Sequence, residues 1–152
     1  MKQYIGTKII WAAPMTRGEY NQYRGWTIPA NENPDDEGYL VKYSDNYESW
    51  SPAHAFDEAY RPTDGMNLGL ALEAAKRGLR VSRKNWNGKG QYVFLAGDVE
   101  FCTDEDVSEF QGAADGVYVA PMLVLRTAQG TLQPGWLASQ SDLLAEDWYV
   151  VD

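Results

Sequence analysis

The chain contains one cysteine and one histidine, and it has no long apolar run. Cys102 alone cannot form a disulfide within the chain, which fits a reducing compartment. With His54 as the only imidazole, there is no cluster of histidine and carboxylate to hold a catalytic metal. No apolar run approaches the roughly 20 residues of a membrane-spanning helix, and residues 1–6 lack the apolar core of a secretory signal. These absences predict a cytoplasmic protein without membrane, metal or cofactor.

Acidic residues outnumber basic ones, and the two kinds are unevenly distributed. The net formal charge is −9. Residues 76–89 hold six Lys and Arg and no acid, whereas residues 98–115 hold seven acids and no base. Broad positive surface supplies most of the affinity for nucleic-acid polymers, so this pattern favours a small anion as ligand. The alternative is a solvated helix end and a solvated loop, since runs of like charge are usually exposed.

Residues 1–61 predict a small domain that begins with a strand and a helix. An alternating run rich in β-branched and aromatic residues predicts a strand over 4–10. Thr16 and Glu19 have the spacing of a capping box, and Gly25 ends the predicted helix.

A hairpin and a second helix complete this predicted domain. Its strands, 39–43 and 47–50, flank a Ser-Asp-Asn turn. The helix begins near Pro52, a residue type favoured at the first helical position, and runs to Tyr60. Its periodicity places three apolar side chains on one side: Ala55, Phe56 and Ala59.

Pro and Gly in 61–65 predict a linker, after which helical periodicity restarts. A helix is predicted over 67–77, with Asn67 as its cap and Gly78 in the left-handed position at its end. Strands are predicted over 80–83, 91–96, 117–127, 131–133 and 148–151. The acidic insertion 98–116 is predicted to be a loop or lid. The expected fold class is α+β, with two small domains, 1–61 and 66–152, each an antiparallel sheet packed with short helices.

Two indole rings bracket residues 136–148. Ser139 and Asp142 have capping-box spacing, which predicts a helix over 141–146. Backbone N–H groups at a helix start attract anions. Trp86 lies in the basic run beside the tight Asn87-Gly88 turn, where the backbone can approach a ligand and Lys89 can meet a phosphate. Both segments therefore predict binding of an anionic ligand.

Four motifs of the second domain match a known family. They are Met66-Asn67-Leu68-Gly69 with Leu72-Glu73-Ala74, Arg83-Lys84-Asn85-Trp86-Asn87-Gly88-Lys89-Gly90, Thr127-Ala128-Gln129-Gly130, and the segment 136–148. Over 66–152 the chain thereby resembles the Thoeris anti-defense 2 family of phage proteins. Through Gly38-Tyr39 and Ser49-Trp50-Ser51-Pro52, residues 1–61 resemble a small phage domain of unknown function.

The resemblance implies sequestration and no enzymatic activity. Family members act as sponges that bind glycocyclic ADP-ribose, a cyclic ADP-ribose derivative made by bacterial TIR-domain enzymes, without cleaving it. The resemblance further implies a homo-oligomer, a tetramer, with pockets shared between subunits in the cytoplasm of the infected bacterial host. Other cyclic nucleotide signals are additional candidate ligands, and no nucleic-acid polymer is expected as a partner.

The residues and the resemblance together define a candidate ligand site. A cyclic nucleotide presents a base, ribose hydroxyls and a pyrophosphate, which require aromatic rings, hydrogen-bonding groups and positive or N–H-rich surface. The predicted contacts are Trp86, Asn87, Gly88, Lys89, Ala138, Ser139, Gln140, Asp142 and Trp148. Core packing is the alternative for the two indoles, and it accounts for Trp148 equally well. A candidate second anion site consists of Arg77, Arg80 and Arg83.

Binding energies favour a site that is shared between chains. Competition with a cellular receptor needs nanomolar affinity, about −12 kcal/mol. One stacked base contributes roughly 1–3 kcal/mol, and one charge-assisted hydrogen bond contributes roughly 1.5–3 kcal/mol. A small domain encloses a nucleotide more easily if two chains form the walls. Oligomerisation is therefore expected.

Two other classes of function stay open at this point. In an enzyme, Asp142, Glu146 and Asp147 would supply paired carboxylates, with Asp142 and Glu146 on one helix face. Against this, Asp142 has a structural role at the helix start, and Cys102 and His54 lack partners for catalysis. In a structural or protein-binding factor, the tyrosines and tryptophans of 1–61 would form an adhesive surface, unless they simply build the cores of the two domains.

Overall fold

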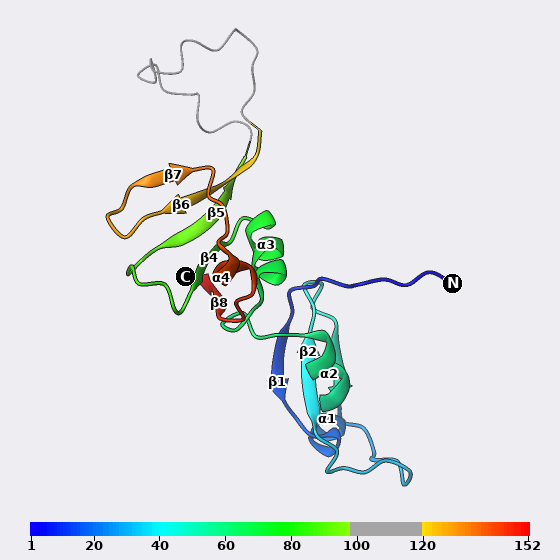
Figure 1. Ribbon diagram of the computed structural model, residues 1–152. Helices are drawn as coiled ribbons and strands as arrows, with labels where there is room; N and C mark the ends of the chain where they lie inside the picture. Colours follow the sequence, from blue (N-terminus) through cyan, green and yellow to red (C-terminus); the bar gives the residue numbers. More distant parts are fainter. Residues whose placement is uncertain (98–119) are drawn as a thin grey trace. The chain divides into compact units, whose positions relative to one another are not determined.

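The structure is a computed structural model that describes residues 1–97 and 120–152. These residues form two compact units, Met1–Arg61 and Pro62–Asp152, here called unit 1 and unit 2 (Figure 1). Each unit contains one antiparallel sheet and short helices. The predicted α+β fold class is therefore confirmed. The acidic insertion 98–116, predicted as a loop or lid, lies entirely outside the described residues.

Unit 1 is built on a three-stranded antiparallel sheet in the order β1-β2-β3. Its strands are β1 (Trp11–Pro14), β2 (Gly38–Lys42) and β3 (Glu48–Pro52). The hairpin of β2 and β3 was predicted correctly. The strand predicted over 4–10 was wrong, because the first strand begins at Trp11. Trp11 pairs with Lys42, the last residue of β2, so the ladder between β1 and β2 ends at this pair.

The two helices of unit 1 start where the sequence predicts. In α1 (Arg17–Arg24), Thr16 accepts a hydrogen bond from the Glu19 amide, and the Glu19 carboxylate accepts one from the Thr16 amide. Gly25 ends the helix at φ +69°. These contacts confirm the predicted capping box and the predicted end of the helix.

The second helix, α2 (Ala53–Ala59), is rotated relative to the prediction. Phe56 stacks on Tyr39 of β2, with 4.0 Å between ring centroids, and also contacts Tyr60. Ala55 and Ala59 are exposed, so they do not share the inner face with Phe56. The stacking of Phe56 on Tyr39 sets the rotation, because an aromatic ring buries more apolar surface than two alanine methyl groups.

Unit 2 is built on a five-stranded antiparallel sheet in the order β7-β6-β5-β4-β8. Its elements are α3 (Leu68–Lys76), β4 (Arg80–Arg83), β5 (Tyr92–Ala96), β6 (Met122–Arg126), β7 (Leu132–Pro134), α4 (Gln140–Leu143) and β8 (Trp148–Val151). All predicted strands of this unit exist. Strand β6 is shorter than its prediction, and residues 117–119 lie outside the described part of the chain. The last strand, β8, pairs with β4 and so brings the end of the chain beside the start of the unit.

The core of unit 2 lies between α3 and one face of the sheet. Asn67 caps α3 by accepting a hydrogen bond from the Leu70 amide, and Gly78 follows the helix at φ +84°, as predicted. The buried cluster comprises Met66, Leu68, Ala71, Ala74, Ala75, Val81, Val93, Ala145 and Trp148. Small alanines let the helix approach the strands closely, and the burial of these side chains is the main contribution to the stability of the unit.

The other face of this sheet carries a different set of side chains. Because residues alternate between the two faces of a strand, the neighbours of the core residues Val81, Val93 and Trp148 point away from α3. We call this surface the open face and define it by Arg80, which is exposed, and by four half-buried residues, Tyr92, Phe94, Arg126 and Tyr149. Tyr92 lies between two guanidinium groups, 5.2 Å from Arg80 and 5.7 Å from Arg126.

Candidate functional site

Arg83, at the end of β4, is the centre of a buried polar cluster in unit 2. Its Nη1 donates to Oδ1 of Asp142 at 2.8 Å, and its Nε donates to Oδ1 of Asp147 at 2.8 Å. The arginine side chain is only 12% exposed. Its position follows from β4, which places Arg83 on the same face as the core residue Val81. A buried guanidinium needs charged partners, and the two carboxylates supply them.

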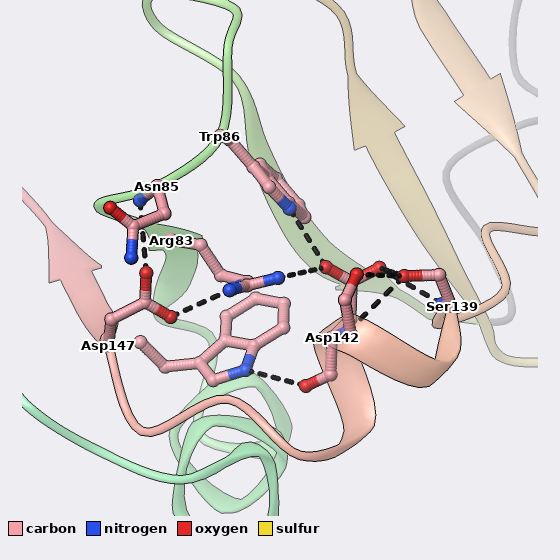
Figure 2. Close-up of polar contacts among 8 residues, drawn as sticks. Arg83, Asn85, Trp86, Ser139, Asp142 and Asp147 are labelled. Atoms are coloured by element: carbon pink, nitrogen blue, oxygen red, sulfur yellow. Dashed lines mark hydrogen bonds and ion pairs between the residues drawn. The ribbon is translucent and has the colours of Figure 1, made fainter.

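Asp142 accepts hydrogen bonds from three side chains. Figure 2 shows its carboxylate between Arg83, Trp86 and Ser139. Oδ1 accepts from Nε1 of Trp86 at 2.9 Å in addition to Arg83. Oδ2 accepts from the amide and the hydroxyl of Ser139, at 2.9 and 2.6 Å. Burial acts to raise the pKa of Asp142, but the hydrogen bonds from Ser139, Arg83 and Trp86 outweigh it and lower the pKa to about 2.

Asp147 fixes the turn that carries Trp86. Its Oδ2 accepts a hydrogen bond from the Asn85 amide at 3.0 Å, while its other oxygen binds Arg83. Burial acts to raise the pKa of Asp147, but the hydrogen bonds from Arg83 and Asn85 lower it overall. The hydrogen bonds to Asp147 and then to Asp142 raise the pKa of Arg83. The cluster therefore keeps two carboxylates and one guanidinium charged, and its net charge is negative.

Three indole rings pack edge to face beside this cluster. The ring centroids of Trp86, Trp136 and Trp148 are 5.5 to 6.0 Å apart, with interplanar angles between 63° and 79°. This is the geometry that aromatic pairs prefer. Trp148 is 0% exposed, and its Nε1 donates to the backbone oxygen of Asp142 at 3.1 Å. Trp148 is therefore part of the core of unit 2, as the packing alternative predicted, and its predicted contact with a ligand stays a prediction. Trp86 and Trp136 are half-buried.

The other predicted contact residues lie on two segments next to the cluster. Asn87 and Lys89, in the turn after Trp86, are exposed, as are Ser139 and Gln140 at the start of α4. Gly88 and Ala138 are half-buried. The structure thus brings the two predicted segments together, because Trp86 and Ser139 both bind Asp142.

Gly88 is needed for packing within the chain. A Cβ atom on Gly88 would lie 2.5 Å from the Gln91 side chain and 2.9 Å from Cβ of Ala128. The sequence suggested that Gly88 lets a ligand approach the backbone closely. In the structure, the side chains close to Gly88 are those of Gln91 and Ala128 in the same chain.

The start of α4 differs from the prediction in one respect. Ser139 and Asp142 do form a capping box, but α4 is a single turn and ends at Leu143. Glu146 therefore lies outside the helix, and the prediction that Asp142 and Glu146 share a helix face was wrong. The carboxylate of Asp142 occupies the helix start, where an external anion was expected to bind.

The candidate second anion site of Arg77, Arg80 and Arg83 does not form a single cluster. Arg83 is paired with two carboxylates inside unit 2. Arg80 lies over Tyr92 on the open face, and Arg77 donates to the backbone oxygen of Glu73. Arg80 and Arg83 are three residues apart on one strand, so alternation sends their side chains to opposite faces.

A shallow groove adjoins the indole cluster. It has a volume of about 520 Å³ and is lined by Leu132, Gln133, Pro134, Gly135, Trp136 and Leu137. Trp136 belongs to both the groove and the indole cluster.

The sequence prediction placed Trp136 at the edge of the ligand segment but did not include it, Asn85 or Asp147 among the contacts. Arg83 was the sequence signal that could have indicated Asp147, because an arginine on the core side of a strand requires buried acids.

The described residues show neither a metal site nor a membrane span. Within 1–97 and 120–152, no three His, Cys, Asp or Glu side chains are grouped to hold a metal ion. None of the helices in the same ranges has the length and apolar composition needed to cross a bilayer.

Comparison with known proteins identifies the family of unit 2. A family model described as the Thoeris anti-defense 2-like domain matches residues 66–151. A protein of Bacillus phage SP01 named Thoeris anti-defense 2 is 36% identical over 91 residues, which cover 57% of this chain and 94% of the phage protein. The matched range contains the whole Arg83 cluster and the three indoles. The chain belongs to the Thoeris anti-defense 2-like family.

Proposed function

We propose that this protein counteracts a Thoeris-type bacterial defence by binding glycocyclic ADP-ribose, or a related cyclic nucleotide signal, and holding it without cleavage. Its place of action would be the cytoplasm of the infected host. Family membership supports the anti-defense role. The ligand and the sequestration mechanism rest on the geometry of unit 2.

The observation that carries the proposal is the way Trp86 is held. Its Nε1 is bound by Asp142, and its ring packs against Trp136 and Trp148. The indole is half-buried, so part of it is available to a ligand while its orientation is already set. A preoriented ring loses little conformational entropy on binding. Stacking of one base on it would contribute roughly 1–3 kcal/mol.

The pyrophosphate would be bound by groups other than Arg83. Because Asp142 and Asp147 neutralise Arg83, its charge is not available to a phosphate. Lys89 and the backbone of the Asn87-Gly88 turn are the nearest candidates in sequence to Trp86, and Ser139 and Gln140 would contact ribose hydroxyls or phosphate. These residues are proposed contacts.

A complete pocket would need a second subunit. The groove beside Trp136 is shallow and open, whereas nucleotide-sized ligands bind in sites that bury most of their surface. The open face carries the aromatic side chains Tyr92, Phe94 and Tyr149, and such residues are enriched at subunit interfaces. We therefore propose a homo-oligomer, a tetramer, that assembles through this face and shares its ligand pockets between subunits.

Catalysis is not favoured by the chemistry of the acids. A general acid needs a pKa near the working pH, but hydrogen bonds hold the pKa of Asp142 at about 2 despite its burial. Asp147 also has a lowered pKa and shares Arg83 with Asp142. Both carboxylates serve to position Trp86 and α4, so we propose that the ligand leaves the site unchanged.

A depletion and release experiment tests this proposal. The full chain is incubated with glycocyclic ADP-ribose, loss of free ligand is measured, and the protein is then heat-denatured and the released ligand identified by mass spectrometry. We expect depletion followed by recovery of intact ligand. Recovery of an altered ligand would establish an enzyme, and absence of depletion with this and other cyclic nucleotides would refute binding.

A matched pair of variants locates the site. Trp86→Ala is expected to remove ligand retention, because the stacking ring is lost. Trp26→Ala, at an exposed tryptophan of unit 1, is expected to retain the ligand. Circular dichroism confirms that each variant is folded. Equal retention by both variants would exclude Trp86 as the ligand platform.

A further inference from the structure

A groove of about 450 Å³ lies between α1 of unit 1 and the loop that follows this helix. It is lined by Thr16, Gly18, Glu19, Gln22, Trp26, Ile28, Pro34 and Asp35. Hydrogen bonds tie the loop to the helix. The Glu32 carboxylate accepts two from Arg17, at 2.8 and 2.7 Å, and one from Asn21 at 3.0 Å. The Pro34 oxygen accepts one from the Gly18 amide at 2.9 Å. The groove is therefore formed in advance of any partner.

The groove leaves a large apolar side chain exposed, that of Trp26. Trp26 is 51% exposed, and Ile28, two residues further on, is 43% exposed. The Trp26 amide donates to the Asn21 oxygen at 2.8 Å. Its ring packs edge to face on the buried Tyr20, with 5.8 Å between centroids, and Arg24 lies over it at 5.0 Å. A tryptophan that its own chain orients and leaves exposed in a groove is typical of the residues that dominate the energy of protein interfaces.

The charged residues that line the groove are both acids, Glu19 and Asp35. Both are exposed, and neither forms an ion pair within the part of the chain that the structure describes. Of the nearby bases, Arg17 is already paired with a carboxylate of the loop, and Arg24 lies over the indole. The groove therefore attracts a cationic group of a partner and repels an acidic one.

We propose that this groove binds a short segment of a partner protein in which a large apolar side chain stands next to a lysine or arginine. The apolar side chain packs on Trp26 and Ile28, and the cation lies near Glu19 and Asp35. A volume of about 450 Å³ suits a few side chains. The same charges disfavour the nucleotide proposed for unit 2, because its pyrophosphate is negative. Unit 1 thereby has a binding function of its own.

Titration of the full chain with three synthetic peptides tests this proposal. The peptides have equal length and contain leucine with arginine, leucine with glutamate, or serine with arginine. Binding is followed by NMR at the Trp26 indole proton, which is assigned by its absence from Trp26→Ala. We expect the leucine–arginine peptide to shift this signal to saturation. The other two peptides should bind at least about tenfold more weakly, because one carries the wrong charge and the other has no apolar side chain to bury.

A charge variant separates recognition from folding. Glu19→Gln keeps the capping box, because glutamine also serves at this position, and together with Asp35→Asn it removes both charges of the groove. We expect this double variant to bind the leucine–arginine peptide about fivefold more weakly. Glu58→Gln, at an exposed acid of α2 that does not line the groove, is the matched control and should bind as the parent chain does.

The two proposed binding functions can fail separately. Trp26→Ala should lose the peptide and retain the nucleotide, whereas Trp86→Ala should do the reverse. Absence of a shift with the leucine–arginine peptide, equal binding of all three peptides, or unchanged binding by the charge variant would overturn the groove proposal. A Trp26 shift that depends on protein concentration without any peptide would assign the groove to a second copy of the chain and would also overturn it.

Discussion

At the scale of single residues, Asp142 connects the parts of the candidate site. It receives Arg83 from β4, Trp86 from the following turn and Ser139 from the start of α4. The carboxylate is largely buried, with a side chain that is 10% exposed, so its charge is tolerated only because these donors surround it. Removal of that charge would therefore affect stability and the orientation of Trp86 together.

The lowered pKa of Asp142 predicts acid sensitivity of unit 2. The pKa falls from its ordinary 3.8 to about 2 in the folded state, so the stabilisation is complete above pH 4 and is lost as the pH falls toward 2. This difference corresponds to about 2 kcal/mol. We expect Asp142→Asn to be less stable than the parent chain by about this amount at pH 7 and equally stable near pH 2. Denaturant unfolding followed by NMR at the Trp148 indole proton measures it, and a gap independent of pH would contradict it.

At the scale of elements, the turn between β4 and β5 is held at two points. Asp147 binds the Asn85 amide at one end, and Gly88 packs against Ala128 further along. The turn carries Trp86, so its shape decides how the indole is presented. Tight packing against another turn makes that shape sensitive to a single added methyl group.

Gly88→Ala is predicted to destabilise unit 2 by about 1–3 kcal/mol through overpacking. The Gln91 amide can rotate away from the new methyl group, but Cβ of Ala128 at 2.9 Å cannot. The double change Gly88→Ala with Ala128→Gly should recover part of the loss. Gly65→Ala is the matched control, because no atom lies within 4 Å of the position of its Cβ. Thermal denaturation compares the variants, and equal melting temperatures for Gly88→Ala and Gly65→Ala would refute the packing argument.

At the scale of the whole molecule, the proposed oligomer would form through the open face of unit 2 and complete the ligand pockets. Aromatic side chains such as those on this sheet face are enriched at subunit interfaces. Variants on this face can therefore remove the interface.

Light scattering of the full chain tests this interface. We expect the mass to be four times the 17.1 kDa of one chain. Adding Phe94→Glu on the open face should lower the mass, because burial of an unpaired carboxylate is unfavourable. Leu144→Glu, at an exposed leucine after α4, should leave the mass unchanged. A monomeric parent chain that still binds ligand tightly would refute the shared pocket.

Much of the local structure follows from short stretches of sequence. Thr16 with Glu19 and Ser139 with Asp142 form their capping boxes as expected, and Asn67 and Gly78 delimit α3 as expected. These features depend on residues a few positions apart, so spacing and composition alone determine them. The motifs around Trp86 and Trp136 are also enough to identify the family, because family membership is recognised from the sequence itself.

Tertiary structure alone decides how these elements are used. Arg83 is 59 residues from Asp142 and 64 from Asp147, so only the pairing of β4 with β8 reveals that it is neutralised and unavailable to an anion. The same pairing buries Trp148. Charge, burial and strand pairing depend on contacts between distant parts of the chain, whereas caps and turns depend on neighbours.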